Sequence, residues 1–60
     1  MAAVTYAYDG QTAYAPWKGR WVRVEVRTAM GDTAHCVNEL HGIDTWFKVN
    51  ELREAANGDS

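Results

Sequence analysis

The sequence predicts a small all-β protein, a five-stranded barrel. First, Val22, Val24 and Val26 alternate with charged residues, and alternation with period two is typical of a strand with one buried face. Second, glycine-containing turn signals separate several short apolar stretches. Third, a chain of 60 residues has a marginal core, and a sheet that curls into a barrel covers its apolar face and removes exposed edges.

In the N-terminal third, one strand and one loop are expected. Residues 3–8 place Val4, Tyr6 and Tyr8 at spacing two, which favours a strand. Residues 9–19 begin with Asp-Gly, contain the only proline and end in glycine, so they are predicted to form a loop that folds back on the barrel.

The central hairpin is the clearest element. Residues 20–28 form the valine-alternating strand, residues 29–32 a turn, and residues 33–40 the partner strand. On that partner strand Ala34 and Cys36 share one face, while His35 and Val37 share the other.

After a second turn at residues 41–44, residues 45–49 are expected to form a further strand. Phe47 and Val49 lie on one side of it, and Trp46 and Lys48 on the other. Trp21 and Trp46 share the parity of charged neighbours, so both are predicted to face outward.

The C-terminal stretch has two interpretations. Asn50 can cap a short helix that Gly58 ends, or residues 50–52 form a 3-10 turn followed by a short closing strand. The barrel is expected to span residues 1–56, with residues 57–60 as a disordered tail.

Several segments resemble the SH3 domain. "VTYAY" (4–8) is similar to the opening "ALYDY" motif, and "WKGRWVRVEV" (17–26) to the "KKGERLxIV" segment. "MGDTAHCV" (30–37) is similar to "xGDWWxAx", and "DTWFKVNELREA" (44–55) to the "xGYIPSNYVxxx" ending. The resemblance covers nearly the whole chain in order, and it implies an SH3-like barrel of a bacterial or phage type.

The proline-peptide groove implied by this resemblance is largely replaced. Tyr6 and Tyr8 match two of its aromatic walls. Thr33 stands where the family has a tryptophan, Lys48 where it has a proline, and Glu51 where it has a tyrosine. Because such grooves grip a polyproline helix between aromatic walls, the framework is expected to persist without its usual ligand.

Composition argues against several functional classes. The formal charge of −2 disfavours general attraction to nucleic acid, and no run of about 18 apolar residues is present to span a membrane. One cysteine and the absence of a secretory signal pattern favour the cytoplasm. Cys36, His35 and His41 are too few for a structural zinc site, and neighbouring strand residues point to opposite faces, so His35 is not expected to activate Cys36. We therefore expect no enzyme activity, metal or cofactor.

Aromatic side chains are the better functional indication. A small barrel buries only a few of them, and exposed aromatics are enriched at protein interfaces. The sequence therefore predicts a non-catalytic module that binds a protein partner or a second copy of itself, with an accessory protein of a bacterium or phage as the expected setting. Its candidate contacts are Tyr6, Tyr8, Tyr14, Trp17 and Trp46. The alternative is a nucleic-acid-binding barrel that uses Lys18, Arg20, Arg23 and Arg27.

Overall fold

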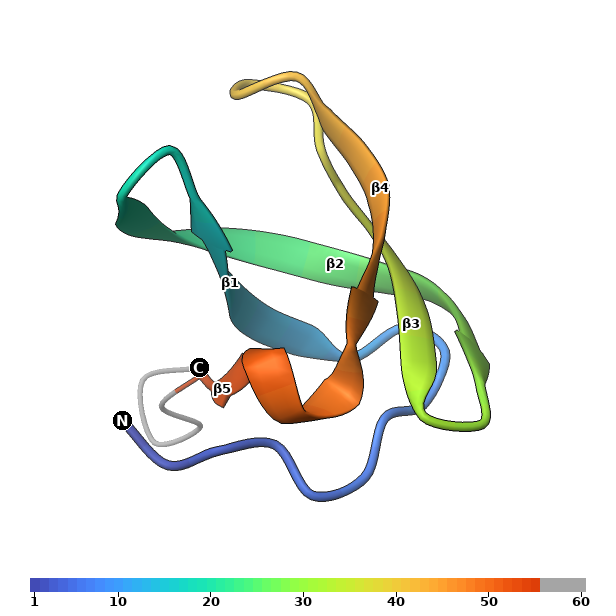
Figure 1. Ribbon diagram of the computed structural model, residues 1–60. Helices are drawn as coiled ribbons and strands as arrows, with labels where there is room; N and C mark the ends of the chain where they lie inside the picture. The colour runs from blue at the N-terminus through green and yellow to red at the C-terminus, as the bar shows by residue number, and fades with distance from the viewer. Residues whose placement is uncertain (56–60) are drawn as a thin grey trace.

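The computed structural model describes residues 1–55 and is all-β, as predicted (Figure 1). Five antiparallel strands pair in the order β4-β3-β2-β1-β5. Their bounds are Thr12–Trp17 for β1, Arg20–Met30 for β2, Thr33–Asn38 for β3, Ile43–Lys48 for β4 and Arg53–Glu54 for β5. A 3-10 turn, η1 (Val49–Glu51), joins β4 to β5 and begins one residue before the predicted turn. The C-terminal stretch thus follows the turn-and-strand interpretation, and the expected tail at 57–60 lies outside the described residues.

The sheet is open, so the expected closed barrel is not formed. Within residues 1–55, β4 and β5 stand at the two ends of the strand order and do not pair with each other. The outer edge of β5 is covered by the N-terminal segment, which runs beneath β5 and η1 in Figure 1. Val4 N donates to Leu52 O at 3.0 Å, and Glu54 N donates to Ala2 O at 2.7 Å. The free sheet edge is therefore that of β4.

The predicted strand at residues 3–8 is wrong. Only Ala3 forms a bridge, with Arg53, and Val4 is the last residue bonded to the β5 region. β5 has only two residues, so it offers no further backbone groups for pairing. Val4 is buried, whereas Tyr6 and Tyr8 point into solvent. The spacing of two between Tyr6 and Tyr8 thus does not reflect the buried face of a strand.

The predicted loop at residues 9–19 is also wrong, because it contains β1. Its inward residues are Ala13 and Ala15, both fully buried, and the small side chains made this face inconspicuous in the sequence. Pro16 lies opposite Trp21 on β2, but β5 pairs only with Ala13 and Tyr14. Pro16 therefore lacks a strand neighbour on its other side, where proline is tolerated.

The strand predicted at residues 20–28 is confirmed and continues to Met30. The register with β3 shifts between Val26 and Thr28, so Arg27 occupies a β-bulge. The bulge reverses the side-chain parity, which turns Ala29 towards buried Ala34. The turn expected at residues 29–32 is accordingly only the two residues between β2 and β3. The alternation of apolar and charged residues in the sequence does not predict this shift in register.

The two following strands are confirmed with different bounds. β3 ends at Asn38 instead of residue 40, and β4 begins at Ile43 instead of residue 45 and ends at Lys48 instead of residue 49. The turn between them consists of residues 39–42, where Gly42 has a φ of 70°. Buried Ile43 extends the inward face of β4 beyond Phe47.

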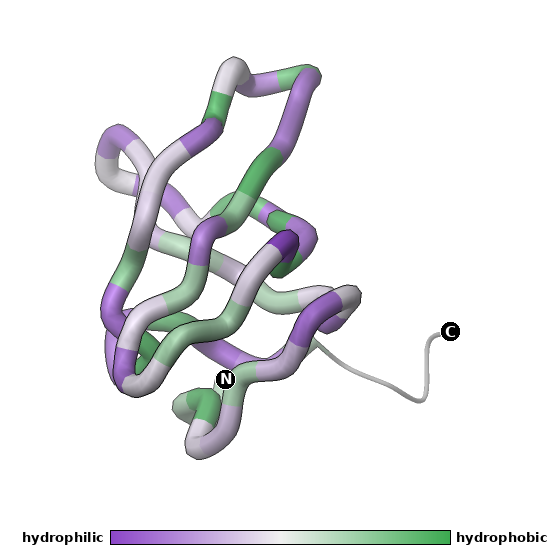
Figure 2. The backbone as a smooth tube through the Cα atoms, turned by 90° about the vertical axis from the view of Figure 1, so that its right-hand side faces the viewer, coloured by the Kyte–Doolittle hydropathy of each residue, from purple (hydrophilic) through white to green (hydrophobic). Residues whose placement is uncertain are grey.

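The core is built from small and medium side chains. Val22, Val24 and Val26 face it as predicted, together with Ala34 and Cys36. Ile43 and Leu52 are the largest side chains that are fully buried. Apolar and polar residues alternate along the strands instead of separating into blocks, as the hydropathy colouring of Figure 2 shows. Among the described aromatic residues, only Phe47 is buried in this core.

Candidate protein-binding surface

The most exposed aromatic side chains belong to Tyr6 and Tyr8, which we call the tyrosine ridge. Their exposed fractions are 73% and 52%. The two rings stack on each other with centroids 6.2 Å apart and an interplanar angle of 28°. The ridge thus presents a continuous aromatic surface to solvent.

Gln11 holds the ridge in shape. Tyr8 N donates to Gln11 Oε1 at 3.1 Å, and Gln11 Nε2 donates to the carbonyl oxygen of Tyr6 at 3.3 Å. A side-chain amide thereby supplies the hydrogen bonds that a neighbouring strand would otherwise give to this segment.

The segment is also fastened to β2. Gly10 N donates to Val26 O, and Val26 N donates to Gln11 O, both at 2.8 Å. Beyond the bulge, Ala29 N donates to Asp9 Oδ1 at 2.9 Å. Gly10 turns the chain here with a φ of 89°, a conformation that favours glycine. The ridge is therefore anchored on β2 although it belongs to no strand.

Thr5 and Tyr6 line two surface hollows. The larger, about 500 Å³, extends from Thr5 and Tyr6 to Asp32 and Val49. The smaller, about 240 Å³, places both tyrosines beside Gln11. An aromatic ridge beside two hollows offers a partner both a projecting surface and recesses for its side chains.

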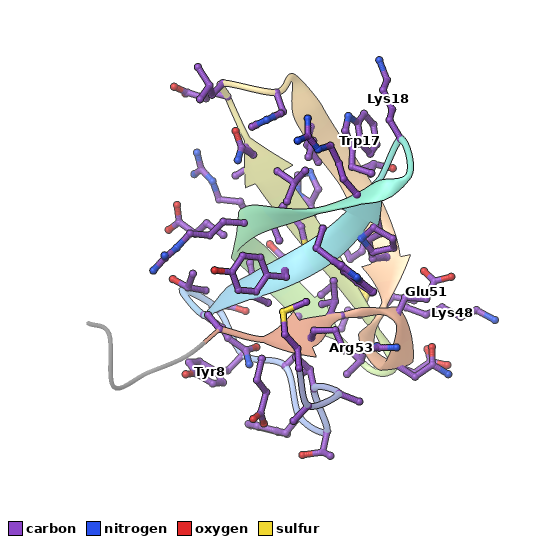
Figure 3. All side chains as sticks on the ribbon, turned by 90° about the vertical axis from the view of Figure 1, so that its left-hand side faces the viewer. Tyr8, Trp17, Lys18, Lys48, Glu51 and Arg53 are labelled. Atoms are coloured by element: carbon purple, nitrogen blue, oxygen red, sulfur yellow. The ribbon has the colours of Figure 1, made fainter. Side chains whose placement is uncertain are left out.

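The other predicted contact residues do not join the ridge. Trp17 lies at the opposite end of the molecule from Tyr8 (Figure 3) and packs partly against the core. Tyr14 is half-buried on β1, between Arg23 and Arg53 on the neighbouring strands. The structure therefore divides the predicted aromatic set among separate places.

Trp46 forms a second exposed group on the outer face of β3 and β4. It faces outward as predicted, with 51% of its surface exposed, and its ring stacks on His35 at 5.3 Å between centroids. His35 Nε2 hydrogen-bonds to Asp44 Oδ1. This group is a cross-strand cluster that holds the Trp46 ring in position.

Trp21 is an outward-facing aromatic outside the predicted set of contact residues. It is 45% exposed, and the Arg53 guanidinium carbon lies 5.0 Å from its ring centroid, a cation–π contact. The outward parity of Trp21 was visible in the sequence. The approach of Arg53 was not, because it depends on β5 pairing with β1.

The four basic residues of the alternative prediction occupy different positions. Arg23 faces outward, and Arg27 lies at the bulge. Lys18 occupies the β1–β2 turn, at the upper tip in Figure 3. Arg20 lies opposite Trp17 at the end of the inward row. All four are exposed.

Cys36 lies on the core side of β3, away from His35. It is fully buried, and burial raises the pKa of its thiol from 9.0 to about 11. Its Sγ is 3.6 Å from the carbonyl oxygen of Ala34. A thiol that is both inaccessible and un-ionised at neutral pH is a poor nucleophile.

Residues 1–55 contain no group of three histidine, cysteine or acidic side chains placed to hold a metal ion. In the same part of the chain, no helix is long and apolar enough to cross a membrane. In comparisons with known proteins, no family model, no curated protein and no solved structure matches this chain.

Proposed function

We propose that this protein is a non-catalytic protein-binding module of the SH3-like type, and that the tyrosine ridge is its principal contact. The strand order and the 3-10 turn between β4 and β5 are compatible with that architecture. The observation that carries the proposal is the ridge itself, two stacked and exposed tyrosines fixed by Gln11 beside hollows.

The physical driver of binding is desolvation of the two rings. The tyrosine side chains are amphipathic, and Gln11 and Asp9 already hold the backbone that carries them before any partner arrives. Pre-ordering reduces the entropy lost on association, and burial of a large apolar side chain contributes roughly 1.5–3 kcal/mol.

The partner is expected to differ from a proline-rich helix. Thr33 pairs with Lys48 across β3 and β4, and Lys48 N donates to Glu51 Oε1 at 3.2 Å. The positions that would supply the other walls of a proline-peptide groove thus carry a hydroxyl and two charges, which Figure 3 shows for Lys48 and Glu51 at one side of the molecule. The ridge therefore favours a partner with its own apolar side chains for the hollows.

The test compares two variants that each lose exposed apolar surface. Partners are captured by photo-crosslinking in cells that naturally contain the protein, and the affinity of each purified partner is then measured by calorimetry. The double variant Tyr6→Ala, Tyr8→Ala should weaken binding by about 2 kcal/mol or more. The control is Leu40→Ala, in the distant 39–42 turn, where the side chain is 89% exposed.

Equal affinity of both variants for every captured partner would contradict the proposal. The same ridge can also join two copies of the chain. Sedimentation equilibrium identifies that outcome, because the tyrosine double variant would then dissociate a dimer that Leu40→Ala leaves intact.

A further inference from the structure

The charges of the chain are divided between two regions. The hairpin of β1 and β2 together with β5 has a net side-chain charge of +3, and the remaining sequence has −5. The positive region holds five of the six cationic residues and two of the eight acidic ones: Lys18, Arg20, Arg23, Arg27, Arg53, Glu25 and Glu54. The total of −2 therefore conceals a basic region on a small molecule.

Aromatic rings lie within this basic region. Tyr14 has Arg23 opposite it on β2 and Arg53 opposite it on β5. Trp21 adjoins the same row, with the Arg53 guanidinium over its ring. We call Tyr14, Trp21, Arg23 and Arg53 the basic aromatic row.

The arginines of this region are available to a ligand. Within residues 1–55, none of their guanidinium groups lies within 4.0 Å of a carboxylate oxygen. Arg53 Nη1 donates to Asn50 O and Leu52 O, each at 3.1 Å, which fixes the guanidinium. Among residues 1–55, no acceptor lies within hydrogen-bond distance of Nε and Nη2, which can donate to a ligand.

A hollow of about 510 Å³ continues from the row along the outer side of β2. Its lining combines two guanidinium groups with carboxylates and an amide: Arg23, Arg27, Glu25, Glu39 and Asn38. Arginine is suited to phosphate, and carboxylate oxygens accept hydrogen bonds from the amino groups of bases.

We propose that the basic aromatic row and this hollow bind single-stranded nucleic acid. Phosphates contact Arg23, Arg27 and Arg53, and unpaired bases stack on Trp21 and Tyr14. A duplex keeps its bases stacked and cannot offer their faces. This inference goes beyond the proposed function, since the tyrosine ridge is not part of the row.

Fluorescence anisotropy with a labelled single-stranded DNA of about ten nucleotides tests the inference. Binding should weaken with salt, with a log–log slope of about −2 for three phosphate contacts. Trp21→Ala and Arg23→Glu should each lower the affinity by about 5-fold or more. The matched controls Trp46→Ala and Lys48→Glu remove an indole ring and reverse a positive charge elsewhere, and they should change the affinity by less than about 2-fold. Lys48 extends away from Arg53 in Figure 3.

Amide chemical shifts of the labelled wild-type protein provide a second measurement that does not depend on any variant folding. The largest changes on adding the DNA are expected at Tyr14, Trp21, Arg23 and Arg53. Absence of salt-dependent binding, equal loss in Arg23→Glu and Lys48→Glu, or equal affinity for the duplex or for polyglutamate would overturn the inference. None of these results would bear on the tyrosine ridge.

Discussion

At the scale of single residues, Cys36 shows how position decides chemistry. The strand alternation was sufficient to predict that Cys36 faces the core and His35 the opposite side, and the structure confirms both placements. What the sequence could not indicate is the cross-strand stacking of His35 on Trp46, which depends on the register of β3 with β4. The same histidine thus serves a surface cluster and not the thiol.

Burial of Cys36 is expected to make the free energy of unfolding fall at alkaline pH. The folded-state pKa of about 11 lies above the ordinary value of 9.0, so the folded protein holds the thiol proton more tightly. The associated stability is fully present below pH 9.0 and is lost as pH rises towards 11. Urea unfolding across this range should show a steeper fall in the free energy of unfolding for wild type than for Cys36→Ala. Parallel curves for the two proteins would contradict a buried, un-ionised thiol.

At the scale of elements, β1 was the main failure of sequence interpretation. Its inward face consists of Ala13 and Ala15, which have no strand preference, and Pro16 is a residue that usually interrupts strands. Tertiary contacts outweigh these local signals, because β1 pairs with β2 along its whole length and with β5 at Ala13 and Tyr14. The tyrosine ridge was predicted as part of a strand for the converse reason: its spacing fitted a strand whose partner is only two residues long.

The turn between β1 and β2 gives a prediction at this scale. Lys18 and Gly19 both have positive φ, 51° and 81°, as a type I′ hairpin turn requires. Lysine is strained in this conformation, whereas asparagine is well suited to it. Lys18→Asn should raise the free energy of unfolding by about 0.5–1 kcal/mol in urea titrations. Lys18→Ala removes the charge without relieving the backbone and should give no such gain; equal stabilisation by both would exclude a backbone origin.

At the scale of the whole molecule, the core is small, and most of the aromatic side chains therefore lie at the surface. Valine, alanine and cysteine fill most of the interior together with Ile43, Phe47 and Leu52, and the tyrosine and tryptophan rings lie outside it or at its margin. The alternation of residue types along the strands was sufficient to predict the all-β fold class and the inward position of the valines. The open sheet, the bulge and the division of the aromatics into separate groups could not be predicted in this way, because each depends on which strands meet and in what register.

The accessibility of individual aromatic rings underlies both binding proposals. Photochemically induced nuclear polarisation, which enhances only the signals of solvent-accessible tryptophan and tyrosine rings, tests it directly. Strong enhancement is predicted for Tyr6, Tyr8, Trp21 and Trp46, and weak enhancement for half-buried Trp17. Silent Tyr6 and Tyr8 signals beside a strong Trp17 signal would contradict this account.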